Sequence, residues 1–371
     1  MEMLERHVVA RGMRQIKYVE VVPVSQAVGL VAGVYEQLAR DLQILPPAVL
    51  HSSVPELLAG VWCVLRETLI VGNVPRLIKE AVAIGVSKAN VCPYCVEAHS
   101  LCLPAKPNRV EQLVPDFSAD HLVAVARWAS RVGAKSTEAP LSVPFNRRDT
   151  CEILGTAVAF HYFNRVVNVF LESSPLALPK TLLWAEGIIR HLGRGMGKRL
   201  ASISARPGDS LMLLLPGTLP EDLQWAQANP VVAGAFGRMA RVVDNLAQSL
   251  IPSQVRTLVA NRIARWNGEP LGVDRSWIEN ATRVLDPPDQ PLATLLLLTA
   301  LASHQVDARL VAAVRAAIGC PDPRDWSRYL VSVVAWAAFA AARRVGTWLE
   351  SYREISTAAA CIAEHRVGAD A

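Results

Sequence analysis

Hydrophobic residues recur every three to four positions along most of the chain, which is the spacing of amphipathic helices. The first periodic segment begins near Gln26, and the second follows two consecutive prolines, Pro46 and Pro47. Later segments start at Pro75, at residue 116 and at residue 150, with prolines between them. In the segment 116–132, Ser118 is suited to cap the N-terminus of the helix. This pattern predicts an all-α fold.

The first 22 residues depart from the helical pattern. They carry charges throughout and lack the apolar stretch of a signal peptide. Their only regular piece, IKYVEVV, alternates over too few positions to predict more than an edge strand or an ordered arm. We expect residues 1–22 to form an exposed N-terminal arm.

Two apolar runs, 292–302 and 329–342, raise the question of membrane spans in a chain that is 51% hydrophobic with a mean hydropathy of +0.25. Both runs are shorter than the roughly 20 residues that a helix needs to cross a bilayer. We therefore predict that they are buried core helices and that the protein has no membrane partner.

Length, charge and cysteine content indicate the number of domains, the kinds of partner and the cellular location to expect. A chain of 371 residues is longer than one ordinary domain and suggests two. The net charge of +5 is spread without a basic stripe, so we expect no nucleic-acid partner. The seven cysteines are odd in number and show no disulfide framework, which favours a reducing, cytoplasmic location.

The strongest chemical signal lies between residues 80 and 99, where an acid, two thiols and an imidazole occur together: Glu80, Cys92, Cys95 and His99. Pro93 is suited to the first position of a helix, so Cys92 is predicted to cap a helix that runs through His99. Spacings of three and then four residues place both thiols and the imidazole on one face of that helix.

This arrangement favours thiol chemistry. Both sulfurs lie in the first helical turn, where the helix dipole favours thiolate. His99 is one turn from Cys95 and can move a proton to or from it, while Glu80, on the preceding helix, would reach the site by packing and end a proton relay. Spacing alone leaves the attacking sulfur open, because the helix end favours Cys92 and the contact with His99 favours Cys95.

The four residues match the pattern E-x(11)-C-x-x-C-x-x-x-H, which resembles the AhpD-like family of alkylhydroperoxidases and carboxymuconolactone decarboxylases. The resemblance implies a helical fold and a peroxidase cycle. Cys95 would attack the peroxide and become a sulfenic acid, Cys92 would protonate the leaving group and close a disulfide, and Glu80 with His99 would relay protons. It also implies a dithiol reductant such as a lipoyl-bearing protein. Tyr94 departs from the family, whose peroxidases often have a second His there.

Other interpretations of these residues stay open. The C-x-x-C pair would serve as half of a zinc site if His99, Glu80 or another subunit completed it. Glu80 would alternatively pair with Arg76 one turn earlier and face solvent. Cys102 is interpreted as a packed apolar residue rather than a third redox partner. Alternative functions are a lactone decarboxylase or isomerase, with Glu80 and His99 as acid and base, and a non-catalytic scaffold.

Two further segments contain candidate polar residues. The predicted helix 150–171 contains an F-N-R segment similar to one in the AhpD-like fold, so His161, Asn164 and Arg165 would line the cavity. A lone imidazole is more often a hydrogen-bonded core residue, and we prefer that interpretation for His161. The basic segment 193–207 is interpreted as a linker rather than an anion site; its basic residues are Arg194, Lys198, Arg199 and Arg206.

The chain also contains an internal repeat. A shift of 177 residues lays the segment IPSQVRTLVANRIARWNGEPLG, from Ile251, over VPRLIKEAVAIGVSKANVCPYC, from Val74. Flanking segments match in hydrophobic pattern on both sides. At the four motif positions the second copy has neither thiol nor imidazole, so it cannot perform the same chemistry; Thr257, Glu269, Gly272 and Ser276 replace Glu80, Cys92, Cys95 and His99.

These observations predict an N-terminal arm (1–22), a redox domain (23–192), a linker (193–209) and a degenerate second copy of the domain (210–371). The second copy would supply contacts that single-domain relatives obtain by self-association, and we expect a homo-oligomer. No G-x-G-x-x-G motif follows a predicted strand, so we expect no nicotinamide or flavin cofactor.

Overall fold

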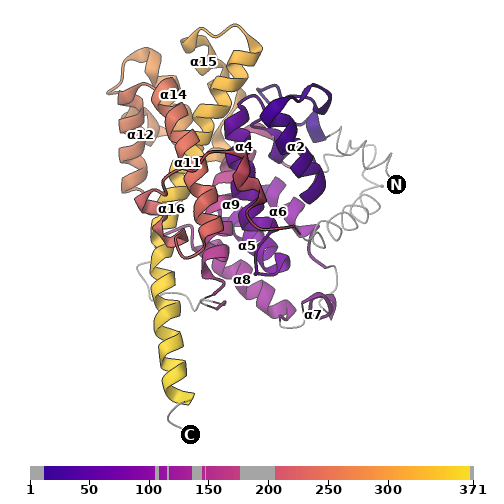
Figure 1. Ribbon diagram of the computed structural model, residues 1–371. Coiled ribbons are helices and arrows are strands. Elements are labelled where there is room, and N and C mark those ends of the chain that lie inside the picture. The colour runs from indigo at the N-terminus through magenta and orange to yellow at the C-terminus, as the bar shows by residue number, and fades with distance from the viewer. Residues whose placement is uncertain are drawn as a thin grey trace, which may run out of the picture.

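The computed structural model describes residues 12–104, 108–114, 117–135, 144–146, 148–175 and 205–367 (Figure 1). Within these ranges every regular element is a helix, which confirms the predicted all-α class. The first half contains η1 (Val24–Gln26), α2 (Gly29–Asp41), α3 (Pro46–Val49), α4 (Pro55–Leu65), the π-helical η2 (Arg66–Ile70), α5 (Arg76–Ala89), α6 (Pro93–Ser100), α7 (Asn108–Leu113), α8 (Ala119–Arg131) and α9 (Thr150–Phe170).

The second half is helical in the same way. It contains η4 (Asp209–Leu213), η5 (Glu221–Ala226), α11 (Pro230–Leu250), α12 (Ser253–Arg265), α13 (Ser276–Thr282), η6 (Pro287–Asp289), α14 (Gln290–Leu301), η7 (Ser303–Gln305), α15 (Ala308–Ile318) and α16 (Pro323–Val367).

Local sequence signals explain several helix starts. Pro55 and Pro93 occupy the first turn of α4 and α6, where a missing N–H costs nothing. Ser118 caps α8 as predicted, because its hydroxyl accepts a hydrogen bond from the His121 N–H at 3.2 Å. The short α7, after Pro107, was not predicted from the hydrophobic pattern.

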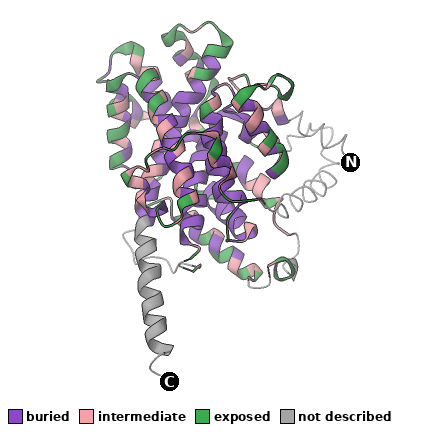
Figure 2. Cartoon of the chain, viewed as in Figure 1, coloured by how far each residue is buried: buried purple, intermediate pink, exposed green. Residues whose placement is uncertain are grey.

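The two apolar runs of the second half are core helices, as predicted. The first run forms most of α14, and the second lies within α16. The stretch Pro323–Leu349 of α16 is long and apolar enough to cross a membrane, but 78% of its most apolar window is buried inside the protein. Figure 2 shows buried residues filling the middle of the molecule, with exposed residues gathered on α12 and α15.

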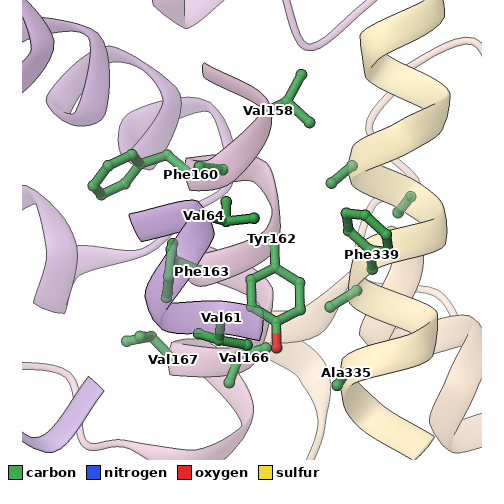
Figure 3. Packing of buried hydrophobic residues seen from close by; sticks show 14 of the residues in the cluster. Val61, Val64, Val158, Phe160, Tyr162, Phe163, Val166, Val167, Ala335 and Phe339 are labelled. Atoms are coloured by element: carbon green, nitrogen blue, oxygen red, sulfur yellow. The ribbon is translucent and has the colours of Figure 1, made fainter. Parts of the chain in front are cut away.

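The core is formed where α9 packs against α16 and α5, and where α4 packs against α11. Tyr162 of α9 meets Phe339 of α16 edge to face, with ring centroids 6.3 Å apart (Figure 3). Phe339 in turn stacks on Phe236 of α11 at 6.4 Å. Buried residues of both halves therefore form one continuous hydrophobic cluster.

The predicted linker lies mostly outside the described residues. Its basic residues Arg194, Lys198 and Arg199 belong to that part, while Arg206 is described and exposed. The domain boundaries on either side of the linker therefore stay predictions.

The prediction of an exposed N-terminal arm is wrong for residues 12–22. The Lys17 N–H donates to the Phe170 carbonyl at 2.8 Å, and the Glu20 N–H donates to Ser327 Oγ at 2.9 Å. The Val22 N–H donates to Ser52 Oγ at 2.8 Å. The arm is not a strand, because these donors bond to helix ends and side chains instead of a neighbouring strand. It lies half-buried across both halves of the chain.

A buried carboxylate holds the turn that leads into α5. Glu152 of α9 accepts hydrogen bonds from the backbone N–H groups of Asn73 and Val74, at 2.9 and 3.0 Å, and pairs with Lys79 Nζ at 2.8 Å. Gly72, with φ +122°, leaves room for this carboxylate, because a Cβ there would overlap it. The start of α5, the helix that carries the acid of the motif, is therefore fixed to α9.

Candidate redox site

The site is built at the junction of α5 and α6. Asn90 ends α5, and Val91 then takes a left-handed conformation with φ 50°, which is rare for a β-branched residue. Cys92 follows as the N-cap of α6, and its N–H donates to the Ser87 carbonyl at 2.9 Å. The predicted Cys92 cap is thus confirmed, and the tight junction brings α6 back against α5.

The structure brings the predicted acid and imidazole together. Glu80 is completely buried, and its Oε2 lies 2.6 Å from His99 Nδ1. Its other oxygen, Oε1, accepts a hydrogen bond from Arg76 Nε at 2.9 Å. The alternative in which Glu80 faces solvent is therefore wrong, although the expected pairing with Arg76 exists. Packing of α6 against α5 excludes water from this carboxylate.

Glu80 is held in its charged form. Burial by itself would raise the pKa of Glu80, but His99 and Arg76 together outweigh burial and keep the pKa below its usual value. Because a carboxylate only accepts hydrogen bonds, Nδ1 of His99 carries the proton between them. Nε2 is then the nitrogen of His99 that can take up a further proton. Phe160 packs edge-on against this ring, with centroids 4.6 Å apart, and helps to orient it.

The two sulfurs are buried and lie near each other. Cys92 is 1% exposed and Cys95 4% exposed, and the thiols are close enough for Cys92 to raise the pKa of Cys95. Burial raises the pKa of Cys95, the neighbouring Cys92 raises it further, and a hydrogen bond from Asn164 opposes the rise. Cys95 is therefore a neutral thiol at rest and needs a proton acceptor before it can attack as a thiolate.

Asn90 fixes the junction to α9, a role that the sequence motif did not reveal. Its Nδ2 donates to Asn164 Oδ1 at 3.0 Å and lies 3.1 Å from His161 Nδ1. Its Oδ1 accepts from Arg165 Nη1 at 3.2 Å, and its carbonyl accepts from Asn168 Nδ2 at 3.1 Å. Every polar atom of the Asn90 side chain is thus bonded to α9, which holds in place the strained peptide before Cys92.

The same network continues into the second half. Arg165 Nε donates to the Ala300 carbonyl at 2.7 Å, and its guanidinium lies 5.8 Å from the centre of the Trp266 ring. Asn168 also donates to Ser303 Oγ at 3.0 Å. Burial lowers the pKa of Arg165 to about 10, which leaves it charged at neutral pH. The loop after α14 therefore supports the residues that position Cys92.

The residues 161–165 belong to this core network. His161 is the hydrogen-bonded core histidine that we preferred, and burial lowers its pKa well below the usual value, with Arg165 lowering it further. It is therefore neutral. Asn164 is fully buried and also donates to Ser87 Oγ at 2.9 Å.

Cys102 lies in the turn after α6, not on the helix itself. Its thiol donates to the Ala98 carbonyl at 3.8 Å and lies near enough to Glu80 for that carboxylate to act on its pKa. Burial raises the pKa of Cys102 far above its usual value, and the charge of Glu80 adds to the rise. Its interpretation as a packed apolar residue therefore missed its contact with the acid.

The four positions that the 177-residue shift aligns with the motif are arranged differently. Thr257 is exposed on α12, and the Ser276 hydroxyl bonds to Asp274. Glu269 Oε2 accepts a hydrogen bond from the Asn267 N–H at 2.9 Å, and Gly272 has φ 65°. Glu269 and Ser276 each bond to a neighbour in the chain and Thr257 is exposed, so these positions form no relay like that of the first half.

The chain is similar to a curated protein along almost its whole length. It is 35% identical over 349 residues to the alkyl hydroperoxide reductase Rv2159c of Mycobacterium tuberculosis, an alignment that covers 92% of this chain and 97% of the relative. No family model and no solved structure matches the chain. Similarity of this extent includes both halves and reaches far beyond the cysteine motif. The chain therefore belongs to the AhpD-like family of alkyl hydroperoxide reductases.

Proposed function

We propose that this protein is a thiol-dependent peroxidase that reduces organic hydroperoxides or hydrogen peroxide through a Cys92–Cys95 dithiol/disulfide cycle. The name of its relative, an alkyl hydroperoxide reductase, supports this class of reaction. The observation that carries the proposal is the buried Glu80–His99 pair on the helix pair α5–α6, where Cys92 and Cys95 are also buried and lie near each other.

The first step is nucleophilic attack by Cys95. His99, one helical turn away, accepts the Cys95 proton at Nε2, and the charged Glu80 stabilises the imidazolium that forms. The thiolate sulfur attacks the outer oxygen of the peroxide, the O–O bond breaks, and the product is a sulfenic acid on Cys95. The leaving alkoxide takes the proton of Cys92 and departs as an alcohol.

The second step closes the disulfide. The Cys92 thiolate attacks the sulfur of the sulfenic acid, the S–O bond breaks, and the hydroxide that leaves takes the proton held by His99 and becomes water. Two thiols and one peroxide thus give one disulfide, one alcohol and one water. The proximity of the two buried thiols, one helical turn apart, supports this assignment, because no large movement is needed before the disulfide forms.

Turnover requires a reductant. A dithiol partner, such as a lipoyl-bearing protein, would reopen the disulfide by thiol–disulfide exchange and supply the two electrons. Such a cycle fits a reducing cytoplasmic location, which we propose for this chain.

For the second half we propose a degenerate copy of the first that supplies its packing partner. The helices that the 177-residue shift aligns lie against each other, α4 on α11 and α9 on α16. This is the arrangement expected when a two-fold contact between identical subunits becomes internal by duplication. We also propose that the two-domain chains associate into a homo-oligomer.

Thiol titration before and after one equivalent of peroxide tests the cycle. We expect wild type to lose two thiols, and Cys92→Ser to form a sulfenate on Cys95 that dimedone traps. Cys95→Ser should form no such adduct, and Cys320→Ser, which removes a cysteine outside the site, should behave as wild type. Absence of thiol loss would overturn the peroxidase proposal. A lactone turnover assay on the same samples would then separate a decarboxylase or isomerase from a scaffold.

A further inference from the structure

A hollow of about 940 Å³ lies between α12 and α13 in the second half. Its size falls at the upper end of the range for small-molecule sites, which is about 300–1,000 Å³. Thr257, which the internal repeat aligns with Glu80, is part of its lining. The position that aligns with a buried acid of the first half thus faces an open hollow in the second.

The hollow is positively charged. Arg262 and Arg265, one helical turn apart on α12, line it together with the amides of Gln254, Asn261 and Asn280, and none of its lining residues is acidic. Among the residues that the structure describes, neither arginine side chain has an ion-pair or hydrogen-bond partner. Guanidinium groups bind carboxylates in a fixed, often bidentate geometry, so these two arginines can bind an anion.

The hollow also has an apolar wall. Trp277, Leu258 and Leu285 contribute to its lining, and Val284, 80% exposed, lies at its edge. The Arg262 guanidinium lies over the Trp277 ring, 5.4 Å from its centre, which places charge beside an apolar surface. In addition, Trp277 Nε1 is buried with no acceptor among the described residues. An oxygen of a bound anion would supply that acceptor.

We propose that this hollow binds an organic carboxylate with an apolar chain, its head between Arg262 and Arg265 and its chain against Trp277 and Leu258. The charge selects an anion, and the tryptophan and leucines favour an amphipathic anion over an inorganic one. The degenerate copy is then a ligand-binding unit as well as a packing partner. The site uses no residue of the thiol cycle, so a test of ligand binding here is independent of the peroxidase proposal.

Isothermal titration calorimetry of the full chain with octanoate tests the site, with octanol and inorganic phosphate as comparison probes. We expect one octanoate per chain and weaker binding of both comparison probes. The double variant Arg262→Gln/Arg265→Gln should bind octanoate at least about tenfold more weakly. The double variant Arg309→Gln/Arg324→Gln removes the same charge from exposed positions outside the hollow and should bind as wild type.

Three results would overturn the proposal: no binding of octanoate to wild type, octanol or phosphate binding as tightly as octanoate, or an equal loss of affinity in both double variants. Thr257→Glu provides an independent variant, because its carboxylate would repel the ligand and should also weaken binding. Unchanged octanoate binding in Thr257→Glu would contradict the location. Cys92→Ser/Cys95→Ser should bind octanoate as wild type, which separates this site from the thiol cycle.

Discussion

The 177-residue shift aligns the helix pair α5–α6 with the pair α12–α13. The two pairs differ in the residue that lies at the position of the acid. In the first half, Glu80 is completely buried and is paired with both His99 and Arg76. In the second half, the aligned Thr257 is exposed at an open hollow. A buried carboxylate is costly without partners, so once the imidazole is absent a neutral residue is the stable choice at that position. The helices are maintained by apolar packing, whereas the chemistry depends on a few mutually dependent polar residues.

The largest expected effect comes from removing the sulfur of Cys95, whose aligned position in the second half is Gly272. Cys95→Ser should lower the rate of hydroperoxide reduction by about a thousandfold or more, because serine is not an activated nucleophile at this position. Initial rates with cumene hydroperoxide and a small dithiol reductant measure the effect. Cys320→Ser is the matched control. A Cys95→Ser variant within tenfold of wild type would exclude Cys95 as the attacking residue.

Substitutions of Glu80 and of the aligned Thr257 give the most direct test of the difference between the two halves. Glu80→Gln should lower kcat by about a hundredfold, because the amide cannot stabilise the His99 imidazolium. Thr257→Ala should leave kcat unchanged, because Thr257 is remote from the thiols. Steady-state kinetics with the same peroxide provide the comparison, and similar losses in both variants would show that the contrast between the two halves is wrong.

Asn90 and Asn267, which the 177-residue shift aligns, allow the junction after α5 to be compared with the junction after α12. Asn90→Ala should reduce the free energy of unfolding by about 2–4 kcal/mol, because Arg165, His161 and Asn164 each lose one hydrogen bond to the Asn90 side chain in the core. Asn267→Ala should have almost no effect, since Asn267 is exposed. Urea unfolding measures both.

The same asparagine variant has a kinetic consequence. If Asn90 positions Cys92, the dimedone-trappable sulfenate should persist longer in Asn90→Ala than in wild type, whereas its rate of formation should change less. A sulfenate lifetime equal to that of wild type would assign Asn90 a purely structural role.

The smallest expected effect is the pH dependence of stability, which a buried histidine of the first half produces. Burial lowers the pKa of His51 to about 3, and His51 Nε2 lies 2.7 Å from Tyr162 Oη. Between the usual histidine pKa of about 6.5 and this folded value, the unfolded chain binds a proton that the folded chain does not. Stability should therefore fall by up to about 1.4 kcal/mol per pH unit as the pH drops below about 6.5.

His51→Gln should remove the His51 share of this slope and leave the share of His161, whose pKa burial also lowers, while His304→Gln, at an exposed position of the second half, should change the slope little. Urea unfolding at pH 7, 6 and 5 gives the slopes. An equal dependence of the unfolding free energy on pH in wild type and His51→Gln would refute the contribution assigned to His51.

Much of the helical framework could be predicted from local signals. Prolines and Ser118 mark helix starts by backbone chemistry alone, and the spacing from Cys92 to His99 fixes one face of α6. The contact between Glu80 and His99 followed only from the family pattern, because the two residues lie on different helices. The C-x-x-C and the acid were thus identified by their spacing, and the structure places the acid against the imidazole.

The rest of the site depends on tertiary packing that the sequence does not show. Asn90 is an ordinary helix-ending residue by sequence, and its four contacts exist only because α9 crosses the junction. Cys102 could not be paired with Glu80 without knowing how the chain turns after α6. The N-terminal arm was expected to be exposed because short alternating segments carry no information about distant helices.

The contacts of that arm have a consequence for the history of the protein. Lys17 bonds to the end of α9, and Glu20 bonds to Ser327 of α16, so a few residues join both halves through the main chain. A descendant gene that encoded either half alone would lose a share of these bonds and expose the apolar surface between α9 and α16. Selection for solubility would therefore act against separation of the two halves.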